Sequence, residues 1–159
     1  MEKKLAINGG DKTITINKPH YVWPEITKET EEAVLKQLNE SISIYDKSGI
    51  IEELENRFAK FHNKKHALLT NSGTTALHSL FVGANLNAGD EIICPAYTFY
   101  ATISPIFFTG ATPVLVDCEE NGNIDPEEIE RKITKKTKAI IITHMWGIPC
   151  KMDEIVSLA

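Results

Sequence analysis

Short apolar runs alternate with helical patterns through the second half of this chain. Strands that are apolar along their whole length are buried on both faces, which is typical of parallel sheets covered by crossover helices. The alternation therefore predicts an α/β fold with three layers, a mostly parallel sheet between two layers of helices. We expect the strands at residues 67–70, 92–94, 114–116 and 139–142.

Helical periodicity predicts the segments before and between these strands. Apolar side chains spaced three or four apart indicate helices over 26–39 and 50–62. Further helices are expected over 74–86, 98–109, with an interruption near Pro105, 126–133 and 151–158. Asp125 before Pro126 is typical of a helix start, because the carboxylate caps free amides and proline fits the first turn. Residues 1–25 lack this period, so we expect an extended arm there and one domain over 26–159.

Composition and charge exclude several classes of protein. The chain has 159 residues and a net charge of −5, which argues against a nucleic-acid partner. No apolar run reaches the ~20 residues that a membrane span needs, and the first residues lack the apolar core of a secretory signal. Cys94, Cys118 and Cys150 fit neither a zinc-ligand pattern nor a disulfide framework. We expect reduced thiols, a cytoplasmic location and no metal site.

The turn Asn-Ser-Gly-Thr-Thr at residues 71–75 joins the first expected strand to a helix. Gly73 lets a ligand approach the backbone closely, and the amides and dipole of a helix N-terminus favour an anion such as phosphate. Thr74 and Thr75 add hydroxyl donors. The same residues are common in an ordinary helix cap without a ligand, so the turn alone leaves both interpretations open.

Other candidates follow the remaining strands. Ligands of open parallel sheets bind beyond the carboxyl ends of the strands. The ends of the four expected strands carry residues 71–75, residues 95–99, Asp117 and residues 144–147, so we expect all four to meet at one edge. Tyr97, Phe99 and Tyr100 could stack there on a flat heterocycle, or they could pack in the core.

Four segments together resemble the DegT/DnrJ/EryC1/StrS family of pyridoxal-phosphate-dependent sugar aminotransferases, which have fold type I. They agree with the family in order and spacing over essentially the whole chain. The arm, at residues 5–10 and 22–24, resembles the branch that includes 3-amino-5-hydroxybenzoate synthases and scyllo-inosose aminotransferases. The four segments are 67–77, 89–99, 110–117 with 123–125, and 138–147 with Met152 and Asp153.

The resemblance implies that residues 26–159 form the N-terminal portion of the large domain of such an enzyme, a partial domain without the C-terminal half of the fold. It implies a site for pyridoxal 5'-phosphate, with phosphate donors on the 71–75 turn and a ring stacked on the pyridine. Asp117 is expected to be structural. The implied cofactor residues are Gly73, Thr74, Thr75 and Phe99, and the implied substrate contacts are Tyr45 and His144.

Two groups that this chemistry needs fall outside the four segments. In the family, the Schiff-base lysine and the aspartate against the pyridinium nitrogen lie further along than residue 159, and no late lysine here matches the family's motif. No catalytic residue is therefore named, and this chain alone is expected to be inactive. The expected partners are a small-molecule substrate and either a second copy in a homodimer or a second chain that supplies the missing half.

The expected activity of the complete protein is transfer of an amino group from glutamate or glutamine to a keto-sugar, cyclitol or related polyol. Within the family, a pyridoxal-phosphate-dependent sugar dehydratase is the alternative. Outside it, the chain could be a non-catalytic module that binds a phosphate ligand, an interaction module, or a simple binder of sugar nucleotides.

Overall fold

The computed structural model describes residues 4–17, 23–40 and 49–159. The chain divides into two units, Met1–Arg57 and Phe58–Ala159, and each is described by itself. Tyr45, the expected substrate contact, lies outside the described residues. The boundary expected between an arm and a domain at residue 25 stays a prediction.

The regular elements described in the first unit are helical. A short 3-10 turn, η1 (Ala6–Asn8), precedes the helix α1 (Lys28–Glu40), and α2 (Ile50–Phe61) begins in this unit and continues into the second. The two helices expected over 26–39 and 50–62 are therefore confirmed to within two residues at each end. Val34, Leu35 and Leu38 of α1 are exposed.

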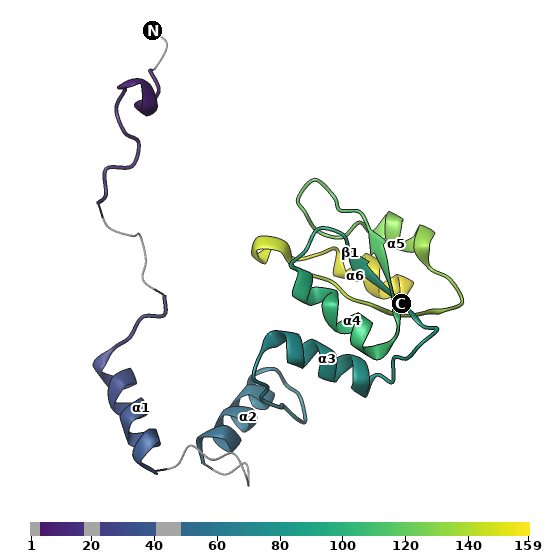
Figure 1. Cartoon of the computed structure of the whole chain (residues 1–159), viewed down its shortest axis with the longest axis horizontal. Helices are drawn as coiled ribbons and strands as arrows, with labels where there is room; N and C mark the ends of the chain where they lie inside the picture. The colour runs from purple at the N-terminus through teal and green to yellow at the C-terminus, as the bar shows by residue number, and fades with distance from the viewer. Residues whose placement is uncertain (1–3, 18–22, 41–48) are drawn as a thin grey trace. The chain divides into compact units, whose positions relative to one another are not determined.

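The described part of the second unit contains one parallel sheet of three strands (Figure 1). The central strand β1 (Glu91–Pro95) pairs on one side with β2 (Thr112–Val116) and on the other with β3 (Thr137–Ile140). Ile93 lies opposite Val114 on one side and Ile140 on the other. This confirms three of the four expected strands, although β3 begins and ends two residues earlier than expected.

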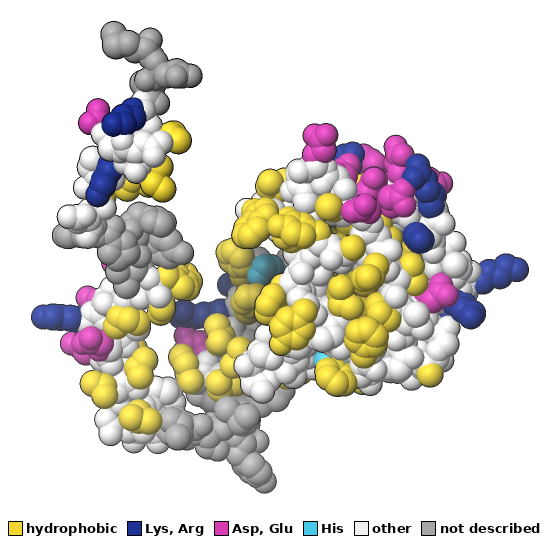
Figure 2. Space-filling model, turned by 45° about the horizontal axis from the view of Figure 1, so that its top comes forward, with side chains coloured by type: hydrophobic (Ala, Val, Ile, Leu, Met, Phe, Trp, Pro, Cys, Tyr) yellow, Lys and Arg dark blue, Asp and Glu magenta, His cyan; other side chains and the backbone are white. Residues whose placement is uncertain are grey.

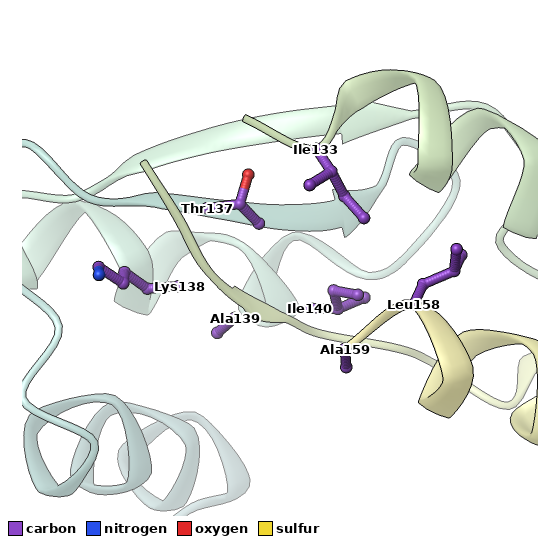
Figure 3. Close-up of a pocket in the computed structure, with 7 residues that line it drawn as sticks. All are labelled: Ile133, Thr137, Lys138, Ala139, Ile140, Leu158 and Ala159. Carbon is purple, nitrogen blue, oxygen red and sulfur yellow. The ribbon is translucent and has the colours of Figure 1, made fainter. Parts of the chain in front are cut away.

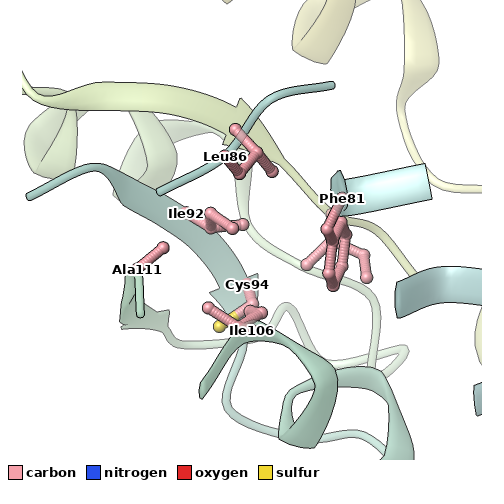
Figure 4. Close-up of a cluster of buried hydrophobic side chains, with 7 residues drawn as sticks. Phe81, Leu86, Ile92, Cys94, Ile106 and Ala111 are labelled. Carbon is pink, nitrogen blue, oxygen red and sulfur yellow. The ribbon is translucent and has the colours of Figure 1, made fainter. Parts of the chain in front are cut away.

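Two apolar cores lie on opposite faces of the sheet because side chains alternate along β1. Ile92 and Cys94 pack with Phe81 of α3 (Gly73–Gly83) and Ile106 of α4 (Ser104–Thr109), as Figure 4 shows. Ile93, on the other face, packs in a second core. That core contains residues of α5 (Pro126–Lys132) and α6 (Met152–Leu158). The three-layer α/β arrangement is thus confirmed.

Local side chains define where the helices begin and end. Ser72 has extended backbone angles, and its hydroxyl accepts the amide of Thr75 at 3.1 Å, so α3 begins at Gly73. The carboxylate of Asp125 accepts the amide of Glu127 at 2.9 Å, which confirms the expected cap of α5. The expected helix over 98–109 is divided into a 3-10 turn, η2 (Tyr100–Thr102), and α4, which has a proline in its first turn.

The strand expected at residues 67–70 is wrong. These residues lie outside the three strands of the described sheet, and Leu68 and Leu69 are 63% and 48% exposed. An apolar run becomes a strand only where a neighbouring backbone supplies hydrogen-bond partners. Here β1 has both of its sides taken by β2 and β3, and residues 67–70 join neither outer strand.

Within the ranges that the structure describes, no helix is both long and apolar enough to cross a bilayer.

Replacing Ser72 by alanine is expected to lower the free energy of unfolding by about 1 kcal/mol. The change removes the oxygen that satisfies the Thr75 amide at the start of α3. Urea unfolding of this chain measures the loss, and Ser79→Ala on the same helix is the matched control, since Ser79 is exposed and lies past the first turn. Equal stabilities for the two variants would contradict the assignment of the cap.

The three cysteines are expected to react with iodoacetamide in a fixed order. Burial raises the pKa of Cys94 to about 11 and raises the pKa of Cys150, so both thiols stay protonated at pH 8, while Cys118 is only partly buried. Peptide mass spectrometry of the native protein should find Cys118 labelled first. In urea, where burial is lost, all three rates should converge. Native labelling of Cys94 as fast as Cys118 would contradict the packing of β1.

Candidate active site

Three segments follow the three parallel strands and therefore leave the sheet at the same edge. We call them the β1 loop (residues 96–99), the β2 loop (residues 117–125) and the β3 loop (residues 141–151). They contain the candidates expected from the sequence after each strand: Phe99, Asp117 and His144. The expected meeting at one edge is confirmed for these three segments by the contacts between them, whereas for the 71–75 turn it stays a prediction.

The β1 loop is joined to the β3 loop by a pair of threonines. The hydroxyl of Thr98 lies 3.0 Å from that of Thr143 and also 3.0 Å from that of Thr102. Because Thr98 precedes Phe99, this bond fixes the backbone from which the Phe99 ring projects.

The β2 loop packs on the β1 loop at a glycine. Gly122 has φ +85°, and a Cβ atom built there would lie 3.3 Å from the Cε1 atom of Tyr97. Any other residue would therefore be strained by its backbone angle and crowded by the ring. The close approach keeps Tyr97 against the β2 loop, although the side chain remains half exposed.

Asn123 connects the β2 loop to the β3 loop from a buried position. Its side-chain oxygen accepts the amide of Met145 at 3.0 Å, and its side-chain nitrogen donates to the carbonyls of Ile148 and Pro149 at 3.1 and 3.2 Å. Only 1% of the residue is exposed, so these bonds replace those that water would have made. Asn123 is not among the site residues expected from the sequence. Its partners lie more than twenty positions away, which no local pattern reveals.

His144 is tied to its own loop. Its Nδ1 atom accepts the amide of Cys150 at 3.0 Å, and the thiol of Cys150 in turn donates to the carbonyl of Thr143 at 3.3 Å. Because a backbone amide can only donate, Nδ1 is the acceptor here, and the N–H group that His144 can offer to a ligand is on Nε2. The exposed His144 therefore has a structural bond on one side and a single donor on the other.

The aromatic side chains of this region are exposed. The core-packing alternative for Tyr97, Phe99 and Tyr100 is wrong, since 49%, 69% and 71% of their surfaces are exposed. The Phe99 and Tyr100 rings meet edge to face with centroids 4.9 Å apart. Exposed hydrophobic side chains are numerous on the surface of the second unit (Figure 2), and Trp146 of the β3 loop, 81% exposed, is another.

Asp117 forms hydrogen bonds to the backbone of its own loop, which agrees with the structural role expected for it. Its carboxylate accepts the amide of Cys118 at 2.8 Å, and its carbonyl accepts the amide of Asp125 at 3.2 Å. These bonds hold the turn of the β2 loop together.

The 71–75 turn combines a cap with open donors. The hydroxyl of Ser72 accepts the amide of Thr75 and lies 3.0 Å from its hydroxyl, so both polar groups of Thr75 face the cap. The amides of Gly73 and Thr74 come before the first intrahelical bond, which Ala76 makes to Ser72. A Cβ atom at Gly73 would meet none of the described atoms within 4 Å, so a ligand has room there.

Two other hollows on the second unit are lined by few polar side chains. One, of about 210 Å³, lies beside the outer strand β3 and is lined mainly by apolar side chains (Figure 3). Thr137 and Lys138 are the polar residues of its lining. The other, of about 400 Å³, lies against one side of α3 and includes Leu68 and Leu80. The polar groups and aromatic rings of the strand ends lie outside both linings.

Comparison with known proteins agrees with the sequence resemblance. The chain is 39% identical over 137 residues to the GDP-perosamine synthase of Escherichia coli O157:H7, covering 86% of this chain and 37% of that protein. It is 37% identical to the dTDP-3-amino-3,6-dideoxy-alpha-D-galactopyranose transaminase of Aneurinibacillus thermoaerophilus, with 83% and 36% covered. The chain thus spans little more than a third of the length of these relatives.

Solved structures show the same likeness. The aminotransferase from Psychrobacter cryohalolentis superposes with a TM-score of 0.83 at 38% identity, covering 89% of this chain and 36% of that one. NtdA from Bacillus subtilis, solved with bound cofactor PMP, superposes with a TM-score of 0.76 at 32% identity, with 84% and 32% covered. Residues 24–159 match the DegT/DnrJ/EryC1/StrS aminotransferase family, and the chain belongs to that family.

Proposed function

We propose that this chain supplies the phosphate-binding and ring-stacking part of a pyridoxal-phosphate-dependent sugar aminotransferase. The complete protein would transfer an amino group from glutamate or glutamine to a keto-sugar, cyclitol or related polyol. Family membership and the names of the relatives, a perosamine synthase and an aminosugar transaminase, support this proposal.

The observation that carries the proposal is the open first turn of α3. The Gly73 and Thr74 amides precede the first intrahelical bond, and the space over Gly73 is clear of described atoms. Adjacent free amides at the positive end of a helix dipole fit a phosphate monoester. Gly73 and Thr74 would hold the phosphate of the cofactor, while Thr75 would contribute mainly by securing the cap.

Phe99 is proposed to stack on the pyridine ring of the cofactor. Its side chain is exposed, and the Thr98–Thr143 bond fixes the backbone beside it. A stacked ring contributes ~1 kcal/mol beyond the area that it buries. When bound, pyridoxal phosphate supplies an electron sink for the amino-transfer chemistry.

His144 and Tyr45 are proposed as substrate contacts. The bond from Cys150 to Nδ1 leaves the Nε2–H group of His144 as a fixed donor, which suits a substrate hydroxyl or carbonyl oxygen. Tyr45 lies outside the described residues, so its part in the proposal rests on the sequence resemblance alone.

Lys151 is not suited to form the Schiff base with the cofactor, because it is paired with Glu119. A hydrogen bond and the charge of Glu119 raise the pKa of Lys151. A lysine that forms a Schiff base must instead lose its proton readily, which requires a lowered pKa. The ion pair therefore holds Lys151 in the form that does not react with an aldehyde.

Borohydride reduction in the presence of pyridoxal phosphate tests the proposed function. The chain alone should acquire no stoichiometric label, whereas the complete protein, or a complex with a chain carrying the missing half, should acquire one cofactor on a lysine outside residues 1–159. Mass spectrometry of the digest locates the label. Stoichiometric label within this chain would contradict the proposal. A complete protein that binds the cofactor without a labelled lysine would instead be the dehydratase, and one that binds none would be a non-catalytic module.

Replacing Thr74 by valine should weaken the binding of pyridoxal phosphate to the complete protein. Loss of one hydroxyl bond to a charged phosphate costs about 1.5–3 kcal/mol, or roughly ten- to hundredfold in affinity. The affinity for pyridoxal, which lacks the phosphate, should stay unchanged. Thr112→Val, an exposed threonine on β2, is the matched control. Equal losses for the two cofactor forms would mean that Thr74 does not contact the phosphate.

A further inference from the structure

Three threonine hydroxyls meet at the edge where the strands of the sheet end. The Thr98 hydroxyl lies 3.0 Å from that of Thr102, four residues further on, and 3.0 Å from that of Thr143 in the β3 loop. A hydroxyl has one proton, so Thr98 donates to one of these partners and accepts from the other. All three residues are partly buried, where such bonds are stronger than in water. Both bonds depend on the hydroxyl of Thr98.

The bond between Thr98 and Thr102 closes the turn that carries Phe99. The amide of Thr102 also donates to the carbonyl of Phe99 at 2.9 Å. Phe99 itself has φ −70° and ψ 137°, in the broad extended region that allows many neighbouring conformations. Steric exclusion therefore does not select this conformation, and the hydrogen bonds around Phe99 do.

Neighbouring elements hold the same turn from other directions. The amide of Ala96, at the start of the β1 loop, donates to the carbonyl of Val116 at the end of β2 at 2.8 Å. Leu77 of α3 and Ile103, just after η2, pack against one buried core, which Figure 4 shows. The turn is thus held by β2, by the β3 loop and by the layer of α3, whose first turn has the open amides.

We propose that Thr98 is a positioning residue for the cofactor, because its hydroxyl holds the turn in which the Phe99 ring stacks on the pyridine of pyridoxal phosphate. The inference rests on the proposed function, which places that stacking on Phe99. Stacked rings prefer a limited range of offsets and separations. A ring whose backbone is already held loses less freedom on binding, so it binds more tightly. Thr98 acts through Phe99 and not on the phosphate.

Binding of the cofactor to the complete protein tests this inference, with equilibrium dialysis as the measurement. Thr98→Val keeps the shape of the side chain and loses both hydroxyl bonds. The affinities for pyridoxal phosphate and for pyridoxal should fall by the same factor, roughly threefold to tenfold, because stacking involves the ring and not the phosphate. Thr98→Ser keeps the hydroxyl and should restore most of the affinity.

Thr109→Val is the matched control. Thr109 is also partly buried, and its hydroxyl donates to the carbonyl of Ile106 at 2.8 Å, at the end of α4 rather than at the strand ends. Its replacement removes a comparable bond, and both affinities should equal those of the wild type.

A double-mutant cycle with Phe99→Ala separates positioning of the ring from a general structural role. Thr98→Val should cost little further affinity in a protein that already lacks the ring, whereas a general loosening of the fold would cost the same in both backgrounds. The circular dichroism of bound pyridoxal phosphate is the second readout, because it depends on the orientation of the cofactor among its neighbours. At saturation it should change in Thr98→Val and stay that of the wild type in Thr109→Val.

Thr143→Val tests the same group of hydroxyls without altering Thr98. It removes one of the two bonds, so the affinities for both cofactor forms should fall by a smaller factor. Combined with Thr98→Val it should add little, because the bond that it removes is already lost. Fully additive losses would overturn the inference.

Other outcomes would also contradict it. Unchanged affinity and circular dichroism in Thr98→Val, in a complete protein that binds the cofactor, would overturn the inference alone. A loss confined to pyridoxal phosphate would place the effect of Thr98 at the phosphate and would overturn it too. A complete wild-type protein that binds no pyridoxal phosphate would overturn the proposed function, and the inference with it.

Discussion

The parallel direction of β1 and its two neighbours is the constraint on which the rest of the second unit depends. Since all three strands run the same way, each must be followed by a segment at one edge and a return through a helix or loop. Burial of Ile92 and Ile93 on opposite faces of β1 then requires a helical layer on each side. Core packing and the gathering of the three loops therefore have a single cause.

Elements that depend on a local sequence pattern could be predicted from the sequence, whereas contacts between residues far apart in the chain could not. The apolar runs predicted β1, β2 and β3, and Asp125 with Pro126 predicted the start of α5. Residues 67–70 are just as apolar, but a strand also requires pairing with a neighbouring strand, and these residues pair with none of the three strands of the described sheet. Asn123 looks like an ordinary turn residue until the fold brings the β3 loop to it.

The start of α3 shows how a cap and an anion site can share one turn. A helix N-terminus has several amides without intrahelical partners, and they differ in direction. Ser72 takes the Thr75 amide, which lies inside the turn, while the Gly73 and Thr74 amides precede the first intrahelical bond. The two interpretations of the sequence are therefore compatible, because the cap that orders the turn also fixes the donors that a phosphate would meet.

The role of Asn123 is better explained by the conformation of the β3 loop that its hydrogen bonds maintain than by the stability that they add. A buried amide gains little over water when all its hydrogen bonds are made, and it costs more than an apolar side chain if any is lost. An apolar residue at this position would leave the Met145 amide and the Ile148 and Pro149 carbonyls without the partners that they have now. Trp146 lies between these partners with φ 55°, in the left-handed region that bulky side chains avoid. Without the bonds of Asn123 the loop would relax toward a form in which Trp146 leaves that region. A residue that stabilises one strained loop conformation against its relaxed alternatives is expected where the position of an exposed ring matters more than the stability of the loop.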